Sequence, residues 1–295
     1  MPCGLTILFF VTALVGGAPE AGHATSDSLW RTVAQAELIV VGRLTVPARP
    51  KAGDETSANH GYEAIRVDVS RTAKGTPQRS ISVWWYAGGT ESAATAAHLK
   101  AFNGKDGILF LEQDETKTYF VDEVGTALAR ADPEFLARVD REVNAQREAL
   151  RHVEKLFPRP DDGMFVKVKR LVDATVEKDT QAAALRDLAA LDQNAVPAII
   201  ALMDDPRKLA ERKMALRNRA LDRFEEFRRY RPETVTDAMA AILNHITGED
   251  FGSIYNGGSE RERRHAVNGW RIYLSHLKHG INVPKSCQVQ LDFLG

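Results

Sequence analysis

The strongest concentration of side chains that could bind a ligand lies in residues 207–231. This segment holds ten Lys and Arg against four Asp and Glu, a local excess of six positive charges in a chain of net charge -1. Read as a helix, it places four candidate anion-binding side chains on one side: Lys208, Arg212, Arg219 and Arg223. The expected buried stripe beside them consists of Leu209, Leu216, Ala220, Phe224 and Phe227.

A row of guanidinium groups can bind carboxylates or phosphates, because each planar group donates two parallel hydrogen bonds. The segment therefore predicts a basic helix that binds an envelope polyanion or an acidic partner protein. The alternative is a solvated helix face whose positive charges pair with Asp and Glu of neighbouring helices. The near-neutral net charge gives the whole chain no pull toward nucleic acid, and we expect no nucleic-acid partner.

Aromatic side chains gather in SISVWWYAGG, Ser80 to Gly89. On a strand, Trp85 shares a face with Ile81 and Val83 and is expected in the core. Trp84 and Tyr86 point the other way and are the candidate surface aromatics. They could form a stacking platform, or Trp84 could pack beneath the helical region that follows.

Metal and catalytic signatures are absent from the sequence. His276 and His279 are three residues apart, but His265 is about three helical turns away, and we expect a surface histidine pair without metal. There is no HExxH, GxSxG, P-loop or GxGxxG motif. Acidic pairs such as Asp161-Asp162 and Glu249-Asp250 suit helix caps and turns. We predict no catalytic residue, no cofactor and no enzyme; an unrecognised hydrolase is the alternative.

The first residues predict export. Leu5 to Val15 is an apolar run of eleven residues, followed by small residues up to Ala24. This pattern is typical of a signal peptide, residues 1–24, and the run is shorter than the roughly 20 residues of a membrane span. An uncleaved core segment is the alternative. We expect a periplasmic or extracellular protein with no membrane span after cleavage. Only Cys287 would remain, so no intrachain disulfide could form.

Residues 28–124 predict a short helix and then five strands. The helix shows Leu29, Val33 and Ala36 at helical spacing behind Ser28. The strand candidates are dense aliphatic runs or alternate apolar with polar residues: Leu38–Val46, Ile65–Val69, Ile81–Trp85, Ile108–Leu111 and Tyr119–Val121. Such a set with one long polar loop, 47–61, suits a small closed barrel.

The pattern AELIVVGRL, YEAIRVDVSRTAKG, ISVWW and DGILFLEQDETKTYFV resembles exported bacterial domains of the OB or netrin/TIMP-like barrel type. The resemblance implies a barrel over residues 25–126 with one face able to bind an extended polymer. TIMP-like inhibitors chelate a protease metal through an N-terminal cysteine, and nothing here matches that residue.

From Asp132 onward the pattern predicts helices. Asp132 and Pro133 open a helix that runs to Phe157, within a connecting segment 127–160. Its apolar residues recur every seven positions at Leu136, Val143, Leu150 and Phe157, with Gln146 in the missing slot. This seam could dimerise, but we favour packing within the chain. The oligomeric state stays open.

The stretch AALRDLAALDQNAVPAIIALMDD resembles a HEAT-type repeat. Its two expected stripes are Ala182, Leu185, Leu188, Ala189 and Leu191, then Val196, Ile199, Ile200 and Met203. A second helix pair is predicted over 207–230 and 233–246, and a terminal helix over 259–277, with Phe251 and Trp270 as packing anchors. The sequence thus predicts two domains, β then α: an OB/netrin-like barrel joined by a long helix to a HEAT-like array, residues 161–295. Its expected role is protein binding or scaffolding.

Overall fold

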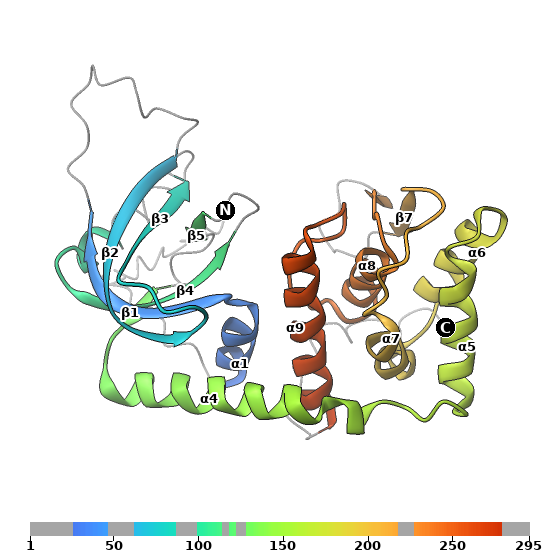
Figure 1. Ribbon diagram of the computed structural model, residues 1–295, viewed down its shortest axis with the longest axis horizontal. Helices are drawn as coiled ribbons and strands as arrows, with labels where there is room; N and C mark the ends of the chain where they lie inside the picture. The colour runs from blue at the N-terminus through green and yellow to red at the C-terminus, as the bar shows by residue number, and fades with distance from the viewer. Residues whose placement is uncertain are drawn as a thin grey trace, which may run out of the picture.

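The computed structural model describes residues 26–46, 62–86, 99–113, 118–121, 128–217 and 227–278. A β part comes first along the chain and a helical part follows, with helix α4 (Pro133–His152) running beneath both (Figure 1). This order agrees with the predicted β-then-α layout. The predicted signal peptide, residues 1–24, lies outside the described residues.

The β part is a six-stranded sheet. Its strands are β1 (Leu38–Thr45), β2 (Tyr62–Lys74), β3 (Ser80–Tyr86), β4 (Asp106–Gln113), β5 (Tyr119–Val121) and β6 (Leu128–Arg130). The pairing order is β1-β2-β3-β5-β4-β6, and β1 also pairs with β4. All pairings are antiparallel except that of β3 with β5. The first five strands occupy the predicted segments; the short strand β6 is not predicted.

Apolar residues on both faces of the sheet place one core on each side of it. On β3, Ile81 and Val83 are buried while Ser80 and Ser82 are exposed, as the alternation predicts. Strand β1 is buried on both faces. Leu38 and Val40 contribute to the inner core, which is shared among the strands, and Ile39 and Val41 to a second core against two helices. Gly42 lets β1 and β2 approach closely, since a Cβ there would lie 2.6 Å from the Asp68 carbonyl oxygen.

The two helices of that second core also join the β part to the helical part. On α1 (Ser26–Gln35), Leu29 and Val33 pack toward the sheet, whereas Trp30 and Ala34 belong to the helical core. Helix α4, capped by Asp132, buries Val139 and Val143 on the sheet side, and 3-10 helix η2 (Val153–Leu156) continues into the helical core.

The seam on α4 therefore packs within the chain. Gln146, in the slot where the heptad pattern lacks an apolar residue, is buried, and its amide nitrogen donates a hydrogen bond of 2.7 Å to the Trp30 carbonyl.

The helical part contains α5 (Gly163–Ala174), α6 (Lys178–Ala189), η3 (Gln193–Ala195), α7 (Val196–Leu202), α8 (Val235–Thr247) and α9 (Glu260–Lys278). The stripe predicted on α7 is confirmed: Val196, Ile199 and Ile200 are fully buried. On α6 the prediction for Ala182 is wrong. Ala182 is exposed and Gln181 is buried, because the Gln181 side chain bonds to a neighbouring backbone segment.

Aromatic side chains anchor the end of the helical part. Phe251 and Trp270 are almost fully buried and meet edge to face with centroids 5.0 Å apart, which confirms them as packing anchors. Trp30 of α1 joins them at 6.0 Å from Phe251. Gly269 on α9 is required here, since a Cβ would lie 2.5 Å from the Phe251 Cβ.

Charged side chains also tie the two parts together. Arg31 of α1 donates to both carboxylate oxygens of Glu249, at 2.6 and 2.5 Å. Arg261 of α9 pairs with Glu37 and donates to the Gln113 carbonyl oxygen at 2.8 Å. The two parts are thus fixed by polar contacts as well as by the shared helices.

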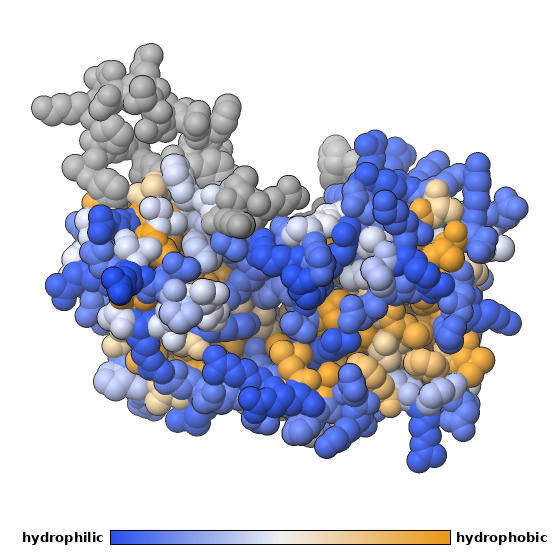
Figure 2. All heavy atoms as spheres, in the orientation of Figure 1, coloured by the Kyte–Doolittle hydropathy of each residue, from blue (hydrophilic) through white to orange (hydrophobic). Residues whose placement is uncertain are grey.

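Hydrophilic side chains cover most of the face seen in Figure 2, with hydrophobic ones showing between α9 and α5. Among the described helices, none combines the length and the apolar character that a bilayer crossing needs.

Candidate anion-binding surface

The basic segment is a β-hairpin where the structure describes it, so the predicted basic helix over 207–231 is wrong. Strands β7 (Met214–Arg217) and β8 (Phe227–Tyr230) pair antiparallel. Met214 and Leu216 are buried while Ala215 and Arg217 are exposed, which is the period of a strand. Leu209 and Leu216, seven residues apart, fit a helix equally well in sequence. The tertiary contacts decide between the two readings.

Two sets of contacts hold the base of the hairpin. The Gln181 side chain of α6 accepts from the Glu211 amide at 2.7 Å and donates to the Glu211 carbonyl at 2.6 Å, as a neighbouring strand would. The Leu209 amide donates to the Glu233 carbonyl at 3.0 Å, and the Val235 amide to the Arg207 carbonyl at 2.9 Å. The chain before β7 is therefore bridged to the segment before α8 at Lys208 and then bends at residues 210–212, so it is not helical.

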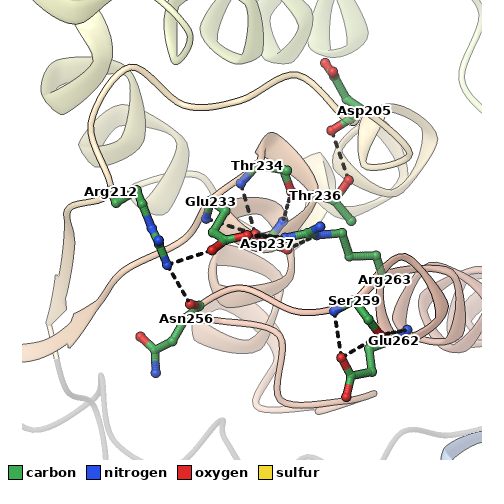
Figure 3. Close-up of polar contacts among 10 residues, drawn as sticks. All are labelled: Asp205, Arg212, Glu233, Thr234, Thr236, Asp237, Asn256, Ser259, Glu262 and Arg263. Carbon is green, nitrogen blue, oxygen red and sulfur yellow. Dashed lines mark hydrogen bonds and ion pairs between the residues drawn. The ribbon is translucent and has the colours of Figure 1, made fainter. Parts of the chain in front are cut away.

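Beneath the hairpin lies an ionic network at the start of α8 (Figure 3). Asp237 is fully buried and accepts hydrogen bonds from the Thr234 amide at 2.9 Å and from Arg263 of α9 at 2.7 and 3.0 Å. The Thr234 hydroxyl in turn caps the helix, forming a capping box with Asp237. Hydrogen bonding to Asp237 raises the pKa of the Arg263 guanidinium above its usual value. This network fixes the segment that follows β8 and leads into α8.

Arg212 belongs to that network. Its guanidinium lies 2.9 Å from Glu233 and donates to the Asn256 carbonyl at 3.4 Å (Figure 3). Glu233 also pairs with Arg263 at 3.1 Å. The positive charge of Arg212 is thus balanced within the protein, which is the outcome that the solvated-face alternative anticipates for this residue.

The remaining predicted cations divide into two groups. Lys208 is exposed, and its backbone forms a bridge to Thr234. Arg219 and Arg223 lie outside the described residues. The neighbouring Arg207 pairs with Asp205 at 2.6 Å and Asp173 at 2.9 Å, and the hydrogen bonds that it donates to these carboxylates raise its pKa. Of the four predicted residues, the structure thus describes two: Arg212, which is paired with Glu233, and Lys208, which is exposed.

The hairpin instead presents two arginines and an exposed phenylalanine. We call this set the outer hairpin face: Arg217, Phe227 and Arg229. The register pairs Arg217 with Phe227 and Ala215 with Arg229, so these side chains share a face. Among the described residues, neither Arg217 nor Arg229 has an ion-pair partner. Phe227 is 45% exposed, and its predicted place in the buried stripe is wrong because it lies on the solvent side of β8.

Sequence reasoning missed the outer hairpin face because it assigned the wrong period. The signal that could have found it is the alternation Met214, Ala215, Leu216, Arg217, where buried and exposed residues change at each step. Two guanidinium groups beside an exposed aromatic ring can bind a carboxylate or phosphate and pack against the carbon atoms that carry it.

The surface aromatics of the β part are only partly described. Trp84 is half-buried on the outer face of β3, in line with exposed Ser82, and lines a hollow in the surface. The backbone of Tyr86 pairs with Tyr62, while its side chain and that of Trp85 lie outside the described residues.

The structure describes one member of the predicted histidine pair, His276, and does not place it on the surface. His276 is mostly buried and stacks on Trp30, with ring centroids 4.4 Å apart and Glu142 at 3.7 Å; His279 lies outside the described residues. His265 contacts the Gln35 carbonyl at 2.7 Å, and burial lowers its pKa to about 4. Within the described chain, no cluster of three His, Cys, Asp or Glu side chains could hold a metal ion.

Comparison with known proteins finds neither a protein family whose model matches this chain nor a matching curated protein.

Proposed function

We propose that this protein is a non-catalytic exported binding protein whose outer hairpin face binds an acidic partner, with a polyanion of the cell envelope as the first candidate. The observation that carries the proposal is the contrast among the basic side chains of one segment. Arg207 and Arg212 are paired with carboxylates, whereas exposed Arg217 and Arg229 have no ion-pair partner among the described residues. Exposed guanidinium groups without an ion-pair partner in the described chain suit bidentate binding of external anions.

We further propose that the scaffold consists of an OB- or netrin-like barrel followed by a HEAT-like helical array. Support for the barrel comes from β1, which pairs with both β2 and β4, so that the order β1-β2-β3-β5-β4 returns to its start. Support for a HEAT-type unit comes from α6 and α7, which follow one another across η3 and contribute residues to one core. Export rests on the apolar run Leu5 to Val15 and its small-residue flank. Sequencing the amino terminus of the purified native protein tests it, with Thr25 as the expected first residue.

Retention on immobilised polyglutamate and polyphosphate tests the anion-binding proposal. We expect retention of the full chain to weaken steeply with salt. Binding releases counterions from the polyanion, and added salt opposes that release and screens the attraction between the charges. The variant R217E/R229E should elute at lower salt, with the salt slope reduced by about two. The matched control R170E/R186E reverses two exposed charges on α5 and α6 and should elute like the unaltered protein after correction for net charge.

Equal losses in both double variants would mean that only net charge matters, and unchanged retention of R217E/R229E would refute the proposed face. An adaptor that binds a folded acidic protein is the second candidate. It is favoured by the exposed Phe227 ring, since aromatic anchors beside Arg are typical of protein interfaces. In that case F227A should weaken binding of the partner but leave retention on polyphosphate unchanged.

A further inference from the structure

A hollow in the surface of the β part has a lining of unusual chemistry. Its volume is about 360 Å³, near the lower end of the range of about 300–1,000 Å³ that small-molecule sites occupy. Its lining includes the amide side chains of Gln78 and Gln113, the hydroxyls of Ser80 and Ser82, and the rings of Trp84 and Tyr119. None of the described residues that line it carries a charge at neutral pH.

This chemistry selects a class of ligand. Amide and hydroxyl groups both donate and accept hydrogen bonds, which matches the hydroxyl groups of a sugar. Trp84 offers a flat apolar face for the C–H side of a sugar ring, whereas Tyr119 lies opposite Val83 and packs partly against the core of the sheet. A nucleic acid or a phosphorylated ligand needs basic groups that neutralise its phosphates, and the described lining of the hollow has none. The lining therefore favours a neutral, hydroxyl-rich ligand over a charged one.

The pairing of the strands builds the hollow from segments far apart in sequence. β5 lies parallel to β3, with Val83 opposite Tyr119, so that Tyr119 is brought beside the strand that carries Trp84. Along β3, Ser80, Ser82 and Trp84 occupy alternate positions and therefore share the outer face.

Gln113 is held from two sides. Its backbone N–H donates to the Glu37 carboxylate at 3.1 Å, and its backbone carbonyl accepts from Arg261 of α9 at 2.8 Å. Glu37 and Arg261 are themselves an ion pair. The wall formed by Gln113 is thus fixed to the helical part, and a fixed wall reduces the entropy that a ligand loses on binding.

We propose that this hollow binds a neutral saccharide, with Trp84 stacking on a sugar ring and Gln113 and the β3 serines bonding its hydroxyls. The site is distinct from the outer hairpin face. The chemistry is the same for a free oligosaccharide and for the neutral end of an envelope polysaccharide.

Calorimetric titration of the full chain tests the proposal. The neutral probes are the hexamers of β-1,4-glucose, β-1,4-N-acetylglucosamine and α-1,4-glucose; hexathymidylate and polyphosphate are the charged comparators. We expect at least one neutral hexamer to bind with Kd below about 1 mM. W84A should weaken that binding by about tenfold or more, while W84F, which keeps a flat ring, should stay within about threefold.

A second variant guards against misfolding of W84A. S82W fills the hollow from an exposed position and should abolish binding while leaving the thermal transition in place. The control V166A alters an exposed apolar side chain on α5 and should bind normally. The proposal is overturned if no neutral hexamer binds, if W84A and S82W bind as the unaltered chain does, or if hexathymidylate binds more tightly than every sugar in a Trp84-dependent way. Retention on polyphosphate that W84A leaves intact separates this result from the fate of the outer hairpin face.

Discussion

Arginine is used in opposite ways at the junction between the two parts and on the hairpin. At the junction, Arg31 and Arg261 lie largely covered and pair with Glu249 and Glu37, which come from the other part of the molecule. On the hairpin, Arg217 and Arg229 are exposed, with no ion pair in the described chain. Arginine thus forms ion pairs between the two parts at the junction and is exposed to solvent on the hairpin.

The difference gives a criterion for separating structural from binding charges. A covered guanidinium must be balanced, because an unpaired charge in a poorly solvated site costs several kcal/mol. An exposed one costs little and remains free to bind an external anion. Arg263 extends the structural class into the helical part, where it is largely covered and pairs with Asp237 and Glu233. The criterion predicts a graded series of effects.

The largest effect is expected at Asp237. D237A removes the partner of Arg263 and leaves the Thr234 and Glu233 amides without their acceptor. Breaking a buried pair on one side costs about 3–5 kcal/mol. We expect a loss of that size in the free energy of unfolding, measured by urea denaturation. D204A, which removes an exposed partner of Arg271, should cost less than about 1 kcal/mol. A loss for D237A as small as that of D204A would break the criterion.

The next effect depends on pH. The His265 ring is neutral in the folded protein, since burial lowers its pKa to about 4 from 6.5. The unfolded chain therefore binds one more proton between these values, and stability falls as pH drops from about 6.5 to about 4, by up to about 3 kcal/mol. H265Q keeps a donor for the Gln35 carbonyl but cannot titrate. The variant should lose less stability over this pH window. Parallel curves for the two proteins would show that His265 is not the titrating group.

Sequence patterning predicts the elements whose faces differ clearly in polarity. On β3, Ile81 and Val83 are buried as expected because they alternate with polar residues. On α7, Val196 and Ile199 are buried as expected because their spacing puts them on one helical stripe. Patterning does not predict burial where a polar side chain forms the hydrogen bonds that a backbone group would otherwise form. Gln181 is buried because it bonds to Glu211, and no hydropathy pattern encodes that contact.

The candidate sites show the same division. The basic charge excess over 207–231 is visible in the sequence, but which guanidinium groups are balanced depends on carboxylates such as Asp173 and Glu233 that only the fold brings near. Trp84 can be identified from the alternation on β3. The other lining residues Gln113 and Tyr119 cannot, because β5 must pair with both β3 and β4 to bring these distant segments together.

A smaller effect is expected from the junction pairs. A double-mutant cycle of R31A and E249A should give a coupling energy of about 1–3 kcal/mol, since both side chains are largely covered and the pair is bidentate. The same cycle on Arg43 and Asp106, an exposed pair at 3.4 Å, should give at most about 0.5 kcal/mol. Equal coupling in the two cycles would remove the distinction between covered and exposed pairs on which the criterion depends.

The smallest effect on stability belongs to the outer hairpin face. R217E/R229E should change the free energy of unfolding by no more than about 0.5 kcal/mol, because exposed side chains without ion-pair partners in the described chain contribute little to folding. The same variant is expected to lose retention on the polyanion matrices. Loss of binding without loss of stability is the result that assigns these charges to a partner. A large loss of stability would instead show that the guanidinium groups are balanced within the fold, and would place the hairpin in the same class as the junction.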